Sequence, residues 1–346
     1  MSTSPQLLLM MHTLFLIFLF CSFLGTILSI SSNSMFNAWM GLEINLLSFI
    51  PLLSNNSNSM ENESMLKYFL IQSIGSSTFL FSSLMNSLFI LSSMNHFLFN
   101  MMIMFTLLLK MGAAPLHNWL INIIEGTSLF VCFLILTWQK IAPLCLSFYC
   151  SMNINFISMF IILSASIGAI GGLNQTSIRK ILAFSSINHV SWLLSSLFIS
   201  KLIFLIYFII YLMINLNLIL IMKKFSIFHL NQMFNFSKKT LNSWFFLPLM
   251  SLGGLPPLSG FMSKWLIIES LIINKFNIIS MILIMSSLIT LFYYMQLYLS
   301  SLLILSTNNK MTSSLNNQLS LSPTFIVLST LSNLSLILIL LFKSSN

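Results

Sequence analysis

The sequence predicts an all-α polytopic membrane protein with about eleven transmembrane helices. Of its 346 residues, 57% are hydrophobic and 5% are charged, and the mean hydropathy is +0.98, so a soluble fold could not cover its surface with polar side chains. Apolar segments of about 20 residues, the length that crosses a hydrocarbon core of roughly 30 Å, recur along the chain. Two of these segments are interrupted by glycine and proline.

The apolar segments group into two five-helix repeats, at about residues 7–147 and 154–303, and a C-terminal helix at about 323–342. All of them belong to one expected membrane domain, residues 1–346. The expected spans are residues 7–30, 35–53, 65–93, 97–124, 127–147, 154–173, 176–198, 202–222, 243–273, 277–303 and 323–342.

Each expected repeat contains one discontinuous helix, in its fourth position. Irregular backbone at membrane depth is tolerated only where it is buried in protein or lines a water-filled cavity. Matched breaks five helices apart are typical of transporters built from repeats, and an odd number of helices in each repeat makes the two repeats inverted. The break residues are Gly112 and Pro115 in the first repeat, and Gly253, Gly254, Pro256 and Pro257 in the second.

The sequence argues against a redox cofactor or a metal ion on this chain. None of its four cysteines forms a CxxC pair, so neither an iron–sulfur cluster nor a zinc site is supported. Glycine-rich phosphate-binding patterns are also absent from the sequence. The net charge of +9 does not indicate nucleic acid, because the basic residues are scattered between apolar segments, where they act as topology signals.

The basic residues in the loops and at the ends of the spans predict that the N-terminus lies inside. With eleven spans, eight lysines and arginines fall on the N-terminal side and three on the other. The eight are Lys67, Arg179, Lys180, Lys223, Lys224, Lys238, Lys239 and Lys310, against Lys201, Lys275 and Lys343. A single arginine and no aspartate, against 33 phenylalanines and 24 methionines, suggest the AT-rich code of an animal mitochondrial genome, so inside would be the matrix.

Five ionisable residues within the spans are candidates for a proton relay. A charged residue at the bilayer centre costs about 2.5–3.5 kcal/mol on insertion scales, and such residues usually mark ion pathways. A lysine that is removed from water holds its proton less tightly, and a nearby carboxylate strengthens that hold, so moving the carboxylate can release the proton. Glu43 and Lys110 are the expected pair. The candidates are Glu43, Lys110, Lys140, His189 and Lys264.

Each candidate also has a structural explanation. Glu43 and Lys110 could be an ion pair that only fixes helix packing. Lys140 could extend toward an interface marked by Trp138, and Lys264, beside Trp265, could be an interfacial anchor. His189 could be a hydrogen-bonded core residue. His117 is expected to bond a carbonyl freed at the first break.

Six motifs resemble, in order, the subunit 2 family of mitochondrial NADH:ubiquinone oxidoreductase (respiratory complex I), in an arthropod form. The resemblance covers about residues 35–298. The motifs are AWMGLEINLLSFIPLL, MLKYFLIQS, LLLKMGAAPLHNW, LTWQKIAPL, GAIGGLNQTSIRKILAFSSINHVSW and SLGGLPPLSGFMSKWLIIE. Animal members of this family lack three N-terminal helices of their bacterial counterparts, which agrees with eleven spans.

The resemblance implies an antiporter-like, proton-translocating subunit of the membrane arm, in the inner mitochondrial membrane. Glu43 matches the glutamate paired with the broken-helix lysine, Lys110. Lys140 matches the central lysine, His189 lies on the same polar axis, and Lys264 matches the terminal lysine. FMSK stands where the family often has a proline before that lysine.

The resemblance also implies where the cofactors and partners are. NADH, FMN, the iron–sulfur clusters and ubiquinone would be bound by partner subunits, and none by this chain. The partners would be other membrane-arm subunits, including neighbouring antiporter-like subunits, and membrane lipids.

Two other classes of function remain open from the sequence. A free-standing sodium/proton antiporter would exchange ions without partners, although the lack of aspartate weakens a sodium site, since hard cations favour oxygen ligands. A non-conducting scaffold would keep full activity after Glu43 and Lys110 are replaced by apolar residues.

Overall fold

The computed structural model describes residues 5–54, 58–88, 93–150, 154–233, 239–256 and 258–308. These residues form helices and connecting loops, with one isolated β-bridge between Ser177 and His229. Six of the described helices are long and apolar enough to cross a membrane. The expected final helix at 323–342 and the break residue Pro257 lie outside the described residues, as do Lys238, Lys310 and Lys343.

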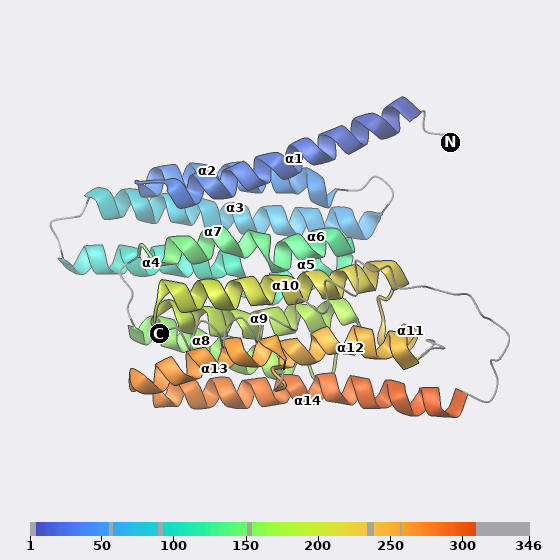
Figure 1. Ribbon diagram of the computed structural model, residues 1–346. Coiled ribbons are helices and arrows are strands. Elements are labelled where there is room, and N and C mark those ends of the chain that lie inside the picture. The colour runs from blue at the N-terminus through green and yellow to red at the C-terminus, as the bar shows by residue number, and fades with distance from the viewer. Residues whose placement is uncertain are drawn as a thin grey trace. The chain divides into compact units, whose positions relative to one another are not determined.

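The chain divides into two compact units, Met1–Ile157 and Ser158–Asn346. Figure 1 labels the helices of each unit. The first unit contains α1 (Pro5–Ser31), α2 (Met35–Leu53), α3 (Ser59–Leu88), α4 (Ser93–Met111), α5 (Asn118–Gly126), α6 (Leu129–Leu136) and α7 (Trp138–Ser147).

Helices α1 and α2 approach each other closely because glycine lies at their contact. A Cβ atom added to Gly25 would lie 2.7 Å from the Asn45 backbone nitrogen, and one added to Gly41 would lie 2.5 Å from the Ser29 nitrogen. Small residues allow this kind of backbone contact between membrane helices. Helix α2 begins where the sequence predicts, because the Ser34 hydroxyl accepts a hydrogen bond from the Asn37 backbone nitrogen at 3.3 Å.

Two expected spans of the first unit differ from the structure. Helix α3 begins at Ser59, six residues before the expected start, because Glu63 and Lys67 are exposed and form an i,i+4 ion pair on the helix. The expected span 127–147 is divided into α6 and α7 at Thr137, which has non-helical φ and ψ of −120° and −69°. Thr137 bonds back to the Phe133 carbonyl through both its backbone nitrogen and its hydroxyl.

The second unit contains α8 (Ile154–Gly171, from Ser158 onward), α9 (Ile178–Leu197), α10 (Lys201–Phe225), α11 (Leu230–Met233), α12 (Lys239–Gly253), α13 (Ser259–Ile273) and α14 (Asn277–Asn308). Helices α12 and α13 both contact α14, with the second break between them. Helix α8 approaches α9 closely at Gly168, where a Cβ would lie 2.6 Å from the Asn188 nitrogen.

Helix α9 is the most deeply buried element of the second unit. Every residue from Ile181 to Leu197 is buried, although the helix carries several serines. The hydroxyls of Ser185, Ser186, Ser195 and Ser196 each donate to a carbonyl three residues earlier, so these polar groups are satisfied inside the helix. The helix can therefore be surrounded by protein on all sides.

Candidate functional site

The first break lies directly after Lys110. Gly112 takes a left-handed conformation (φ +72°), which glycine adopts without steric cost, and this ends α4. The Gly112 and Ala113 nitrogens bond back to the Leu109 and Leu108 carbonyls, each at 3.0 Å. The Trp119 indole nitrogen also donates to the Leu109 carbonyl, at 3.1 Å. The carbonyls freed at the helix end are thus bonded within the break.

The other side of the break is held by His117, as expected. Its Nδ1 lies 3.1 Å from the Pro115 carbonyl oxygen. The peptide bond between Ala114 and Pro115 is cis. The interpretation that His117 bonds a carbonyl at the break is confirmed.

Lys110 is buried at the end of α4, with 6% of its surface exposed. Gly75 of α3 lies against its side chain, since a Cβ there would be 3.4 Å from Lys110 Cγ. The Gln72 amide donates to the Lys110 carbonyl at 3.4 Å. The lysine borders a small cavity of about 20 Å³, enough for a single water molecule. The cavity is lined by Leu42, Asn45, Leu46, Tyr68, Gln72, Lys110, Gln139 and Pro143.

Glu43 is half-buried on α2 and acts on Lys110 through space rather than by contact. An electrostatic interaction joins the two residues, but among the described residues no ion pair closer than 4.0 Å links them. The two charges interact only at longer range, and the role of the Glu43–Lys110 pair in a relay stays a prediction. A direct structural ion pair between Glu43 and Lys110 is not found in this structure.

Lys140 is among the most completely buried large side chains of the described residues, with 1% of its surface exposed. It lies in the first turn of α7, three residues after the interruption at Thr137. Trp138, two residues earlier, is only half-buried. The alternative that Lys140 extends toward an interface is wrong, because its side chain is enclosed by protein.

Neutral polar residues around Lys110 were not singled out from the sequence. The side-chain amides of Asn45 and Gln139 exchange two hydrogen bonds, of 2.8 Å and 3.1 Å. The Tyr68 hydroxyl donates to the Gln139 side-chain oxygen Oε1 at 3.4 Å. These residues line the same cavity as Lys110. Their signal in the sequence was an amide side chain two residues after Glu43 and another directly before Lys140.

The second break is held by Lys264. Gly254 has a positive φ of +87°, and α12 ends directly before it, at Gly253. The Lys264 ammonium donates to the Leu252 and Gly253 carbonyls, each at 2.9 Å, and so satisfies two carbonyls at the end of α12. Lys264 is 5% exposed, whereas Trp265 is 43% exposed. The interfacial-anchor alternative for Lys264 is wrong, because the lysine is directed into the protein.

His189 lies in a cluster of aromatic side chains near Lys264. Its Nδ1 is 2.7 Å from the Tyr207 hydroxyl, and its ring centroid is 4.8 Å from that of Tyr211. Tyr207 stacks on Trp192, with centroids 6.4 Å apart, and the Lys264 ammonium lies 5.7 Å from the Trp192 ring centroid. Trp192 therefore links Lys264 to the His189 cluster within the second unit.

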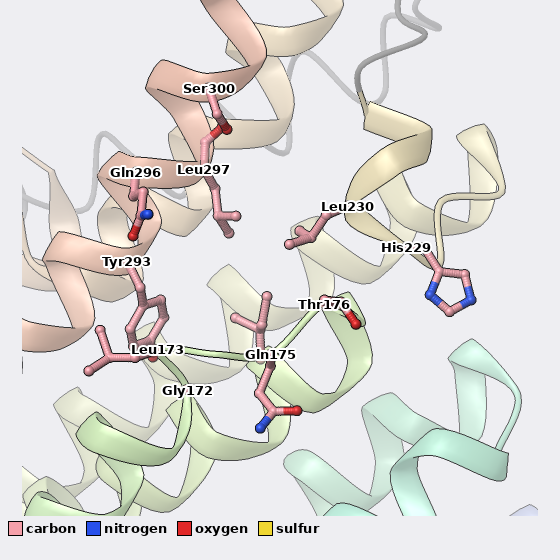
Figure 2. A pocket seen from close by; sticks show the side chains of 11 residues that line it. Gly172, Leu173, Gln175, Thr176, His229, Leu230, Tyr293, Gln296, Leu297 and Ser300 are labelled. Carbon is pink, nitrogen blue, oxygen red and sulfur yellow. The ribbon is translucent and has the colours of Figure 1, made fainter.

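A larger cavity of about 470 Å³ lies elsewhere in the second unit. Figure 2 shows Tyr293, Leu297 and Ser300 of α14 on one wall and Leu230 across from them. None of the five candidate relay residues lines this cavity. Among the described residues, no group of three or more His, Cys, Asp or Glu side chains is placed to hold a metal ion.

The relatives of this chain include insect respiratory proteins. The chain is 48% identical over 325 residues to NADH-ubiquinone oxidoreductase chain 2 of Aedes aegypti, covering 92% of this chain and 95% of the relative. It is 42% identical over 303 residues to the same chain of Locusta migratoria, covering 87% and 89%.

The fold has solved counterparts. A chain of respiratory complex I from Thermus thermophilus matches with a TM-score of 0.78 at 19% identity, over 93% of this chain and 78% of that one. A chain of the Mrp complex from Dietzia sp. matches with a TM-score of 0.70 at 17% identity, over 79% and 58%. At these identities the likeness establishes the antiporter-like fold.

The sequence pattern of the NADH:quinone oxidoreductase/Mrp antiporter membrane family matches residues 32–290, a range that includes both breaks and all five candidate relay residues. The identity to the insect proteins extends over almost the whole length of both chains. The chain therefore belongs to the NADH-ubiquinone oxidoreductase chain 2 family, the membrane subunits of complex I that carry an antiporter-like proton-translocating module.

Proposed function

We propose that this subunit translocates protons through two groups of buried ionisable residues, one in each unit. The first group is Glu43, Lys110 and Lys140; the second is His189 and Lys264. The observation that carries the proposal is the burial of three lysines, exposed by 6%, 1% and 5%, in an apolar helical protein. Such charges are costly in a membrane and are retained at ion pathways.

The two breaks support the same proposal. Lys110 directly precedes one break, and Lys264 donates to the carbonyls of the other. Interrupted helices at membrane depth supply polar backbone groups where ions or protons pass. A lysine at each break is therefore placed where backbone carbonyls and water can exchange hydrogen bonds with it.

The proposal includes a finer membrane architecture. Eleven transmembrane helices would form two inverted five-helix repeats and a C-terminal helix, with the N-terminus in the matrix. The glycine-containing break after α4 in one unit and the one after α12 in the other support this arrangement. The subunit would lie in the mitochondrial inner membrane, as its insect relatives suggest.

The chemistry that drives the protons takes place on other subunits. NADH oxidation and ubiquinone reduction, with FMN and the iron–sulfur clusters, are proposed to belong to partner chains. The partners in the membrane arm would be neighbouring antiporter-like subunits and lipids. This chain itself contributes the proton-binding side chains and the helix breaks next to them.

The experiment that tests the proposal removes one buried charge. Lys110→Met is expected to allow assembly of the intact complex but to lower its proton uptake during NADH oxidation by about tenfold or more, because the relay loses a proton-binding group. Lys67→Met is the matched control, since Lys67 is exposed and paired with Glu63 on α3. Proton uptake by the complex in sealed vesicles is the measurement. Equal proton uptake in both variants would contradict the relay.

A further inference from the structure

Two buried amides join α2 to α7 beside the Lys110 cavity. Asn45 Nδ2 donates to Gln139 Oε1 at 2.8 Å, and Gln139 Nε2 donates to Asn45 Oδ1 at 3.1 Å. Both residues are buried, with 4% and 9% of their surfaces exposed. An apolar pair could fill this space without needing any partner, whereas buried amides must find one. The reciprocal bonds therefore specify one relative rotation of the two helices.

The backbone on both sides of Gln139 provides little restraint of its own. Helix α6 stops at Thr137, and the Lys140 nitrogen bonds to the Thr137 carbonyl, three residues back, at 3.2 Å. Pro143 has no N–H, so it cannot bond to the Gln139 carbonyl four residues earlier. The first turn of α7 thus lacks part of the regular hydrogen-bond ladder, and the Gln139 side chain supplies bonds to other helices in its place.

Gln139 and Lys140 are neighbours on the same turn, so their directions are coupled. Successive residues of an α-helix differ by about 100° around its axis, since there are 3.6 residues in each turn. Gln139 and Pro143, four residues apart, both line the Lys110 cavity, while Lys140 is enclosed elsewhere around α7. Any rotation of this turn that moves the Gln139 amide moves the Lys140 amine with it.

We propose that the Asn45–Gln139 pair is a positioning device for proton transfer, which holds the first turn of α7 so that Lys140 is correctly oriented relative to Lys110. The inference rests on the proposed relay and adds two positioning residues to it. Tyr68 takes part as the third hydrogen-bonding group, because its hydroxyl donates to the same Gln139 oxygen. Neither amide gains or loses a proton itself; the pair acts through the lysine that follows Gln139.

The decisive variant replaces the polar contact by an apolar one. Asn45→Leu and Gln139→Leu are combined with Tyr68→Phe, so that no buried polar atom loses its partner. The complex is expected to assemble normally, with proton uptake lowered about two- to tenfold, as if loss of the three bonds reduced the population of correctly oriented Lys140 by the net contribution of about one hydrogen bond. Full proton uptake in this variant would overturn the proposal, because the pair would then serve packing alone.

A second variant tests whether the amide contact itself is needed. The double variant Asn45→Gln with Gln139→Asn exchanges the two residues. It keeps both amides and their combined length, and is expected to restore most of the proton uptake.

Asn86→Leu is the matched control. The Asn86 amide also joins two helices, since it donates to Asn100 at 3.0 Å, but it does not line the Lys110 cavity. If the exchanged variant takes up protons as poorly as the triple variant Asn45→Leu, Gln139→Leu and Tyr68→Phe, the amide contact has no positioning role.

Lys140→Met, measured in parallel, separates the two proposals. If Lys140→Met lowers proton uptake while the triple apolar variant at positions 45, 68 and 139 does not, the relay holds and the positioning role fails. If Lys140→Met pumps normally, the relay through Lys140 fails, and the positioning role fails with it.

Discussion

The buried lysines of the two units differ in what their ammonium groups contact. Lys264 donates to two backbone carbonyls and lies near the Trp192 ring. The Lys110 ammonium, by contrast, has no hydrogen bond to a protein group among the described residues, and borders a water-sized cavity. One lysine is therefore anchored to the backbone, whereas the other can exchange hydrogen bonds with water.

At the residue scale, Gly254 is expected to be required for the position of Lys264. Gly254→Ala adds a Cβ at φ +87° and places it 3.1 Å from Lys264 Cδ, so both the backbone and the lysine are strained. A left-handed non-glycine residue costs roughly 1–2 kcal/mol, and we expect a stability loss of this size with reduced proton uptake. The thermal unfolding of the purified complex measures the first effect.

Gly253→Ala provides the comparison for Gly254. Its added Cβ would meet Leu291 and Tyr294 at ordinary contact distances of about 3.4 Å, and its φ is not positive. We expect Gly253→Ala to lower the thermal stability of the complex clearly less than Gly254→Ala does. Equal losses at the two glycines would show that the break does not depend on the left-handed conformation.

His189 is expected to depend on Tyr207 for its orientation. Tyr207→Phe removes the hydroxyl 2.7 Å from Nδ1 but keeps the ring that stacks on Trp192. Loss of a buried hydrogen-bond partner costs about 1–3 kcal/mol, so we expect lower thermal stability. If the complex that remains folded also takes up fewer protons, His189 belongs to the relay. Unchanged proton uptake by the folded complex would support a purely structural histidine. Tyr149→Phe, at an exposed position, is the control.

At the scale of elements, the helix breaks were predictable because glycine and proline mark them in the sequence. The bounds of α2 also agree with the span expected at residues 35–53, which was placed from its apolar length alone. The interruption at Thr137 was not predictable, because threonine is common inside membrane helices. The Asn45–Gln139 contact joins residues 94 positions apart, and one sequence contains no information on such a pairing.

The contact of α8 with α9 is expected to tolerate no side chain at Gly168. Gly168→Ala would place a methyl group 2.6 Å from the Asn188 nitrogen, which is backbone and cannot move aside. Overpacking of this kind costs typically 1–3 kcal/mol, so we expect less assembled complex on native gels. Ser166→Ala, on the same helix and half-buried, should assemble normally. Normal assembly of both variants would argue against close packing at Gly168.

At the scale of the whole molecule, the two ends of α10 offer a test of the membrane orientation. Lys201 and Lys223 are exposed at opposite ends of this helix, 22 residues apart in sequence and about 33 Å apart along the axis. We expect Lys223→Cys to react with a membrane-impermeant maleimide from the matrix side and Lys201→Cys from the other side. The unsubstituted chain gives the background from its own four cysteines. The reverse pattern would place the N-terminus outside the matrix.

The hydrogen bonds of Lys264 make the end of α12 sensitive to a single proton. Charge-assisted hydrogen bonds are roughly twice as strong as neutral ones, so loss of the proton would weaken both contacts to Leu252 and Gly253 together. The end of α12 would then be held more firmly when Lys264 is charged than when it is neutral. In the proposed relay, each change in the protonation of Lys264 would therefore also change how firmly the end of α12 is held.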